Sequence, residues 1–369
     1  MPGRAARRPA APELTRPASP VSGPSASSLT SIAAAAGVSL STVSKVLNGR
    51  TDVAPGTRER IARLLRQHGY EPGSKLGFGV VDLVLGGGEC NVNGEPSPWA
   101  EELINGAVVA AAEAGHAVIV TPVSTPDEFD RWLKMAAARG THGALSVLHL
   151  PRGNELKRLA QAGIPVVVVD PAEEPGVGVR SVGTTNFQGG LTATRHLIKL
   201  GHRRIAAIGG PPDKWSARAR VDGYRAAMLE AGLPVDESLI RRDGFSVEAG
   251  RRQARELLGL ADRPSLADRP TGIVTGNDAQ AFGVLQALGE ARLRAPDDVS
   301  VVGFDDLPVA AWASPALTTI RQPLAAMAAT AFRMLRSSEG PAAMEPHHHV
   351  ELATTLVVRD STAPPPAAA

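Results

Sequence analysis

Charged and amide side chains follow several apolar runs of this sequence, at positions where they could bind a ligand. Asp170 follows Val-Val-Val-Val, and Asp305 follows Val-Val-Gly-Phe. Asn277 follows Ile-Val-Thr-Gly, and Arg220 lies just after an Ile-Gly-Gly-Pro-Pro turn. Carboxylates accept and guanidinium groups donate strong hydrogen bonds, so this set suits a hydroxylated ligand. The alternative, that each of these residues only caps a helix or closes a turn, stays open.

A second group of small polar and basic side chains could contact nucleic acid. It occupies the second half of Leu-Thr-Ser-Ile-Ala-Ala-Ala-Ala-Gly-Val-Ser-Leu-Ser-Thr-Val-Ser-Lys-Val-Leu-Asn, from Leu29 to Asn48. Short hydroxyls reach phosphates and base edges, and a lysine can reach the acceptors of guanine. The members of this group are Ser39, Ser41, Thr42, Ser44, Lys45 and Asn48.

The same stretch predicts the two helices that would position this group. Apolar residues recur at helical spacing before Gly37, at positions 32, 33 and 36, and after it, at positions 43, 46 and 47. Gly37 fits the tight turn and Ser39 the N-cap of the second helix. Pro55 predicts the start of a third helix that ends near Gly69. This pattern indicates a helix-turn-helix, although an ordinary helical hairpin would show a similar one.

The rest of the chain alternates short apolar runs with longer amphipathic ones, which is typical of successive βα units. We expect an α/β fold with two doubly wound parallel sheets and a cleft between them, because the strands are too many for one small sheet. The predicted strands cover 80–85, 117–120, 143–148, 166–169, 205–208, 272–275 and 299–304, and the predicted helices cover 103–114, 127–138, 187–200, 217–231, 247–258 and 278–291. In such folds ligands bind beyond the carboxyl ends of the strands.

Length and charge agree with this division. The 369 residues allow two or three domains. Residues 1–27 carry four Lys or Arg against one Asp or Glu, and residues 28–73 carry six against three, so this part has a net charge of +6 and the remainder −4. Such asymmetry is expected where one end meets phosphates. Cys90 is the only cysteine, so no intrachain disulfide can form.

The chain resembles the LacI/GalR family of transcription regulators in both parts. The segments that carry the resemblance are AGVSLSTVSKVLNGR, VAPGTRERI, HGYEP, TRHLIKLGHRRIAAIGG, SARARVDGYRAAM, GNDAQAFGVLQAL, DDVSVVGFDDLPVA and LTTIRQPL, in the order of the family. The resemblance implies a headpiece at 28–73 and a periplasmic-binding-protein-like core at 79–360. It implies a first subdomain of about 79–184 and 322–348 and a second of about 185–321 and 349–360. A disordered basic tail is expected at 1–27 and a flexible tail at 361–369.

Site residues follow from the resemblance position by position. Thr30, Leu40 and the polar group from Ser39 to Asn48 are expected to contact DNA. In the cleft, Arg220 should bind ligand hydroxyls as donor and Asp305 as acceptor. The further residues expected to bind the effector are Trp99, Asp170, Phe245, Asn277 and Gln322. Trp99 could stack on a sugar, or it could be a core residue.

One departure from the family concerns the connection between headpiece and core. Residues 74–78 form a short linker, and Pro72 and Gly73 just before it oppose a hinge helix. Leu76 is the only candidate for the leucine that wedges into the minor groove in most members. We hypothesise a shorter and stiffer connection, for which operators with altered central spacing would be repressed unequally.

These observations predict a dimeric, cytoplasmic, nucleoid-associated repressor of carbohydrate-utilisation genes that binds a palindromic operator and responds to a sugar-like effector. The alternative is a sugar-binding transport or sensing module without a DNA target, which would leave the headpiece unexplained. No cofactor or metal is expected, although residues 347–349 are adjacent histidines. An enzyme is not expected, because no serine lies in a Gly-x-Ser-x-Gly motif and Cys90 has no evident histidine partner.

Overall fold

The structure is a computed structural model that describes residues 29–47, 53–68, 79–86, 96–148, 153–175, 179–259, 269–336 and 349–366. The chain divides into two units, 1–77 and 78–369, each of which is described by itself. The tail expected at 1–27, the linker at 74–78, and Asn48, Leu76 and Cys90 lie outside the described residues.

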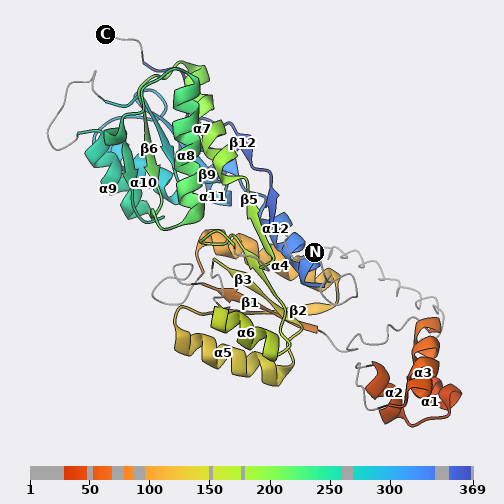
Figure 1. The fold of residues 1–369 in the computed structure, drawn as a ribbon. Coiled ribbons are helices and arrows are strands. Elements are labelled where there is room, and N and C mark those ends of the chain that lie inside the picture. Colours follow the sequence, from red (N-terminus) through yellow and green to blue (C-terminus); the bar gives the residue numbers. More distant parts are fainter. Residues whose placement is uncertain are drawn as a thin grey trace, which may run out of the picture. The chain divides into compact units, whose positions relative to one another are not determined.

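The first unit contains the three predicted helices, α1 (Leu29–Ala36), α2 (Leu40–Leu47) and α3 (Pro55–Gln67) (Figure 1). α1 and α2 are bent by 100° from each other, within the range of helix-turn-helix motifs. Gly37 makes the turn with a φ of 64°, a conformation that glycine adopts without strain. One small core joins the helices, and its buried members are Ile32, Ala33, Ala36, Val43, Val46, Val53, Ile61 and Leu65.

The second unit contains two sheets, and the first is parallel throughout. Its order is β11-β5-β4-β3-β1-β2, with strands β1 (Gly79–Leu85), β2 (His116–Pro122), β3 (Gly143–Val147), β4 (Val166–Val169), β5 (Ser181–Thr184) and β11 (His349–Leu352). Helices α4 (Pro98–Glu113) and α12 (Leu324–Arg336) share a core on one face. Helices α5 (Pro126–Arg139) and α6 (Gly153–Gln161) cover the other face.

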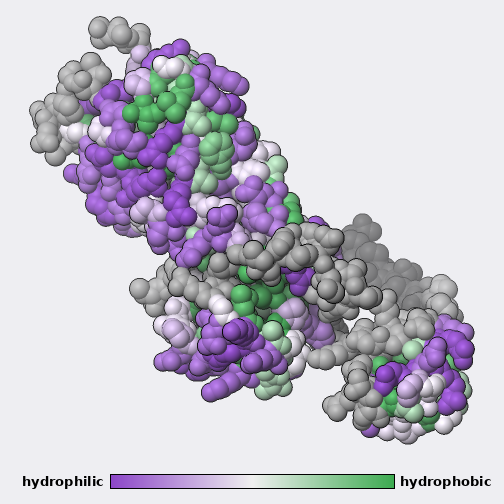
Figure 2. Space-filling view, in the orientation of Figure 1, coloured by the Kyte–Doolittle hydropathy of each residue, from purple (hydrophilic) through white to green (hydrophobic). Residues whose placement is uncertain are grey.

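The second sheet has the order β12-β10-β9-β8-β6-β7. Its strands are β6 (Ile205–Gly209), β7 (Ile240–Arg242), β8 (Gly272–Thr275), β9 (Ser300–Asp305), β10 (Thr318–Arg321) and the antiparallel β12 (Thr355–Val357). Helices α7 (Asn186–Leu200) and α8 (Trp215–Glu230) pack on one face, and α9 (Val247–Leu257) and α10 (Asp278–Glu290) on the other. The 3₁₀ turn η1 (Glu237–Leu239) precedes β7, and the short helix α11 (Pro308–Trp312) follows β9. Figure 2 shows hydrophilic side chains over much of the visible surface of this sheet's helices, with a patch of hydrophobic side chains near α7 and α8.

The chain crosses between the sheets three times. The first two crossings run from β5 to α7 and from β10 to α12, where the boundaries 184/185 and 321/322 were expected. The third differs from the expectation. Because β11 pairs with β5, residues 349–352 belong to the first subdomain, and the crossing follows Leu352 rather than residue 348.

The close approach of α7 and α8 fixes where α8 presents its side chains. A Cβ added at Gly190 would lie 2.0 Å from the carbonyl oxygen of Arg220, and one at Gly223 would lie 2.2 Å from that of Phe187. The two backbones can therefore touch only through glycine. This contact places Arg220 beside the first turn of α7.

Residues 361–363 are hydrogen-bonded to the second subdomain, whereas a flexible tail was expected at 361–369. Ser361 accepts a hydrogen bond from the Thr318 amide at 2.8 Å and donates one to the Val301 carbonyl at 2.6 Å. His202, which is fully buried, lies 2.9 Å from the Ala363 carbonyl through Nε2 and 2.9 Å from the Thr271 hydroxyl through Nδ1. The histidine therefore helps to hold the segment around Ala363 in place.

We predict that His202→Ala lowers the free energy of unfolding by about 1–3 kcal/mol at pH 7.5, because it leaves buried polar groups without a partner. Burial lowers the pKa of His202, so the ring stays neutral in the folded protein. In the unfolded chain the ring takes up a proton at the ordinary histidine pKa of about 6.5. His202 therefore makes its full contribution to the free energy of unfolding above about pH 6.5. This contribution is lost as the pH falls from there toward the lowered pKa of the folded state. Chemical denaturation of both proteins from pH 7.5 to 5.5 tests this. The difference should narrow at low pH, and a constant difference would contradict it.

Candidate DNA-binding surface and ligand cleft

The exposed face of α2 carries most of the residues expected to contact DNA. Ser41 and Lys45 are exposed, Thr42 and Ser44 are half-buried, and the Leu40 side chain is 49% exposed. An apolar side chain exposed at the start of such a helix suits contact with the methyl group of thymine.

The first turn of α2 is held by hydroxyl groups. Ser39 Oγ accepts a hydrogen bond from the Thr42 amide at 3.3 Å and lies 2.8 Å from both Ser41 Oγ and Thr42 Oγ1. This confirms the predicted cap. Thr30 is exposed on α1, and Asn48 lies outside the described residues. The contacts of all these side chains with DNA remain predictions.

In the second unit, a buried cluster forms around Arg220, which is 7% exposed. Its Nε donates to Asn186 Oδ1 at 2.8 Å and its Nη1 to the Gly276 carbonyl at 2.6 Å. The guanidinium carbon lies 3.8 Å from the centroid of the Phe304 ring and 5.9 Å from that of Phe245. Burial lowers the pKa of Arg220, an effect that the carboxylates of nearby aspartates oppose. The guanidinium is thus held in one plane.

Asp305 joins this cluster from the carboxyl end of β9. Its Oδ1 lies 3.8 Å from Arg220 Nη1 and accepts a hydrogen bond from Gln322 Nε2 at 2.6 Å. Gln322 in turn accepts one from Thr184 at 2.9 Å. Asp305 and Asp306 have φ values of 116° and 58°, and such strained backbone persists only where the surroundings enforce it. The structure thus brings Arg220, Asp305 and Gln322 together, as the resemblance implied.

Asp278 holds the backbone at Asp305 and Asp306 in this strained conformation. It is fully buried and accepts hydrogen bonds from the Leu307 amide at 2.8 Å and the Thr319 hydroxyl at 2.6 Å. Burial, and next the charge of Asp305, raise the pKa of Asp278 well above its ordinary value. It therefore holds the turn that presents Asp305.

Three of the residues expected to bind the effector make contacts within the protein itself. Asn277 is the N-cap of α10, with Oδ1 accepting from the Gln280 amide at 2.9 Å and Nδ2 donating to the Phe245 carbonyl at 3.3 Å. The Phe245 ring covers Gly210 and Gly276 beside Arg220. Trp99 is half-buried in the first turn of α4 and packs against the core of the first sheet. A direct role of these three in ligand binding stays a prediction.

Two cavities adjoin the cluster. One, of about 370 Å³, is lined by Asp305, Gln322 and Glu102 of α4. The other, of about 300 Å³, is lined by Asp170, which follows β4, and by Asn186, the residue that binds Arg220. Both cavities have walls from both subdomains. They are the candidate ligand cleft, which the sequence predicts at the carboxyl ends of the strands.

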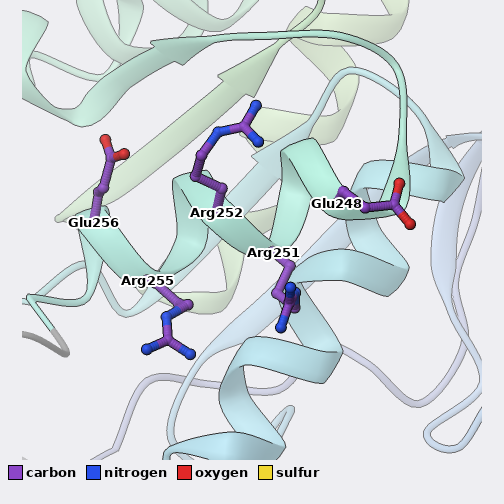
Figure 3. Close-up of a pocket in the computed structure, with 5 residues that line it drawn as sticks. All are labelled: Glu248, Arg251, Arg252, Arg255 and Glu256. Atoms are coloured by element: carbon purple, nitrogen blue, oxygen red, sulfur yellow. The ribbon is translucent and has the colours of Figure 1, made fainter.

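A further surface hollow, on α9, is separate from these cavities. Figure 3 shows Arg251, Arg252 and Arg255 extending from this helix, with two glutamates. Arg251 and Arg255 bind Glu290 at 3.0 and 2.6 Å, and Arg252 binds Asp243. All three arginines are already paired, and none of the predicted site residues lies here.

Among the described residues, no group of three or more His, Cys, Asp or Glu side chains could hold a metal ion. Of the described helices, none alone is long and apolar enough to cross a membrane, and α1 with α2 reaches that length only as the bent pair.

Comparison with known proteins agrees with both units. Residues 28–73 match the family model "Bacterial regulatory proteins, lacI family", and residues 194–362 match "Periplasmic binding protein-like domain". The chain is 35% identical over 338 residues to the HTH-type transcriptional regulator CelR of Thermobifida fusca, covering 89% of this chain and 96% of CelR. It is 32% identical over 296 residues to the ribose operon repressor of Escherichia coli K12, covering 79% and 87% of the two chains. A solved structure of the CelR–cellobiose complex matches with a TM-score of 0.67 and 32% identity, covering 91% of this chain and 99% of that one.

A helix-turn-helix unit joined to a two-sheet ligand-binding unit defines a ligand-responsive DNA-binding regulator. The chain belongs to the LacI family of transcriptional regulators.

Proposed function

We propose that this protein is a cytoplasmic repressor that binds a palindromic operator as a homodimer and responds to a sugar bound in the cleft around Arg220. The observation that supports a hydroxylated effector is the pairing of a buried guanidinium with Asp305 beside two cavities. Two relatives point to the same class, since one is named a ribose operon repressor and the other is solved with cellobiose.

The edge of the first sheet supports the homodimer. β2 is an edge strand with the apolar run Ala-Val-Ile-Val, and Val120 in this run is 37% exposed. α4 packs against β2 and exposes Val108 and Val109 by 47% and 58%. Exposed apolar edges are usually covered, and a second copy would cover this one with the same surface. A dimer would also place two copies of α2 on a palindrome.

Titration of full-length protein onto a palindrome from its own promoter region, at fixed salt and with a panel of sugars, tests this function. We expect tight, salt-sensitive binding by a dimer and a change in affinity with at least one sugar. If the protein bound the palindrome specifically and no sugar changed that affinity, the proposal of a sugar effector would be contradicted. Equal affinity for the palindrome and for random DNA would contradict the operator-binding role.

On the DNA side, we predict that Lys45→Ala weakens operator binding by about 1–3 kcal/mol, with the loss concentrated at one base pair of each half-site. Lys45 is exposed on α2, where a lysine can reach the acceptors of guanine. Competition among operators with single base changes measures this. A uniform loss on specific and random DNA would show that Lys45 contacts phosphate instead.

A further inference from the structure

The cavity beside Asp170 has an aromatic wall that the sequence did not indicate. The rings of Trp215, at the start of α8, and His349, at the start of β11, lie 5.3 Å apart at 49°. The Trp215 amide donates to the Ala172 carbonyl at 2.8 Å, and His349 Nδ1 lies 2.8 Å from Ser181 Oγ. The backbone amide of Trp215 and the Nδ1 atom of His349 are therefore held by hydrogen bonds, and both rings line the cavity.

The carboxylate of Asp170 lines the same cavity, and the nearby charge of Arg220 acts on it. Asp170 is 6% exposed and lines this cavity, and no hydrogen bond from the described residues reaches its carboxylate oxygens. Buried polar groups are normally hydrogen-bonded, so an acceptor of this kind suits a donor supplied by a ligand. Its φ of 47° presents it from the end of β4.

The cavity continues from the Arg220 cluster through Asn186. This residue lines the cavity, is 8% exposed, and accepts the hydrogen bond of Arg220 Nε through Oδ1. A ligand that extends from this cavity to the Arg220 cluster would therefore pass only over the side chain of Asn186. The volume of about 300 Å³ is at the lower end of small-molecule pockets, which suits one ring rather than a whole oligosaccharide.

The charges of the wall restrict the ligand further. Two carboxylates, Asp170 and Glu351, line the cavity, and no Lys or Arg is among its described lining residues. An anionic group such as a phosphate would meet like charges here, while hydroxyl groups would find acceptors. The flat face of the Trp215 ring, in a cavity that also holds such acceptors, fits a ligand ring with one apolar face and hydroxyls at its edge.

We propose that the Trp215 cavity is a second subsite of the effector cleft, which holds one neutral ring of an oligosaccharide whose next ring reaches Arg220 and Asp305. Trp215 is the specificity-determining residue, because its ring forms the stacking wall. Asp170 and Glu351 accept hydrogen bonds from the ligand's hydroxyl groups. The effector class is thus an uncharged saccharide of at least two rings rather than a monosaccharide or a sugar phosphate. This inference rests on the proposed sugar response.

The test compares glucose, cellobiose, maltose and glucose 6-phosphate by calorimetric titration of full-length protein. We expect at least one of the two disaccharides to bind about 10-fold or more tightly than glucose, and glucose 6-phosphate to bind no better than glucose. Trp215→Ala should reduce the ratio of disaccharide to glucose affinity about 10-fold. Leu229→Ala is the matched control, since Leu229 is 67% exposed near the other end of α8 and outside the cavity. Circular dichroism checks the fold of both variants.

Several outcomes would overturn the proposal. Tightest binding of glucose or of glucose 6-phosphate, or an unchanged affinity ratio in folded Trp215→Ala, would exclude the second subsite while leaving a sugar-responsive repressor intact. If none of the four compounds bound, the proposed subsite would be rejected for glucose-type rings. The function proposed above would fail separately, if no sugar of the wider panel altered operator binding.

Discussion

Arg220→Lys should weaken effector binding about 100-fold while the protein still binds its operator. Arginine presents a planar fork of donors, and lysine presents a single ammonium group. The structure uses that fork, with Nε on Asn186, Nη1 on Gly276 and the plane over Phe304. Losing one or two charge-assisted hydrogen bonds to the ligand, at about 1.5–3 kcal/mol each, corresponds to about 100-fold.

Lysine is the appropriate replacement because it keeps the positive charge. Asp170, Asp278 and Asp305 all act on the pKa of Arg220, so alanine would leave buried carboxylates without a cation. Removing one partner of a buried ion pair costs about 3–5 kcal/mol and would confuse binding with folding. Sugar titration of the variant, with a thermal melt to confirm folding, measures the effect.

Arg218→Lys is the matched control, two residues earlier on α8. Arg218 binds only the carbonyls of Pro212 and Asp213, at 3.1 Å each, among described residues, and should tolerate lysine. If Arg220→Lys bound the effector as tightly as the unchanged protein, the cluster around Arg220 would not be the ligand site.

Ile61→Ala should abolish specific operator binding and leave sugar binding unchanged. Ile61 is fully buried in the small core that joins α1, α2 and α3. Truncating a buried isoleucine to alanine costs about 2–5 kcal/mol, comparable with the whole stability of a domain this small. Ile61 lies in the first unit of the chain and the cleft in the second, so ligand binding should not respond.

Anisotropy with labelled operator, together with sugar calorimetry, measures both halves of this prediction. Gln67→Ala serves as the control, because Gln67 is exposed at the end of the same helix and is uncharged. Operator binding within a few fold of the unchanged protein would show that the headpiece does not depend on this core.

The sequence predicted the apolar strands of both sheets and most helices between them. It did not predict β5 or β10, because Ser-Val-Gly-Thr and Thr-Thr-Ile-Arg have no apolar run. It also missed the short edge strands β7, β11 and β12, whose residues are only partly buried. α12 was also missed, although Leu324, Met327, Ala328 and Ala331 recur at helical spacing. That pattern could have identified it.

The ligand cleft was predicted only in part. The residue types of Arg220 and Asp305 gave a local signal, as did the strands before them. Asn186, Phe304 and Asp278 complete the cluster through contacts between distant segments, such as the bond of Asn186 to Arg220, which no local pattern encodes. Asn277 shows the opposite case, since its local signal was that of a helix cap and the structure uses it as one.

We expect ligand binding in the cleft and DNA binding by the headpiece to be coupled, and such coupling must act in both directions. Linkage requires the factor by which the effector changes operator affinity to equal the factor by which operator changes effector affinity. We would titrate the most active sugar into the free protein and into the protein–operator complex under identical salt. We expect the two sugar affinities to differ, typically about 5–150-fold, by the same factor as in the DNA titration. Equal affinities in the two titrations would contradict it.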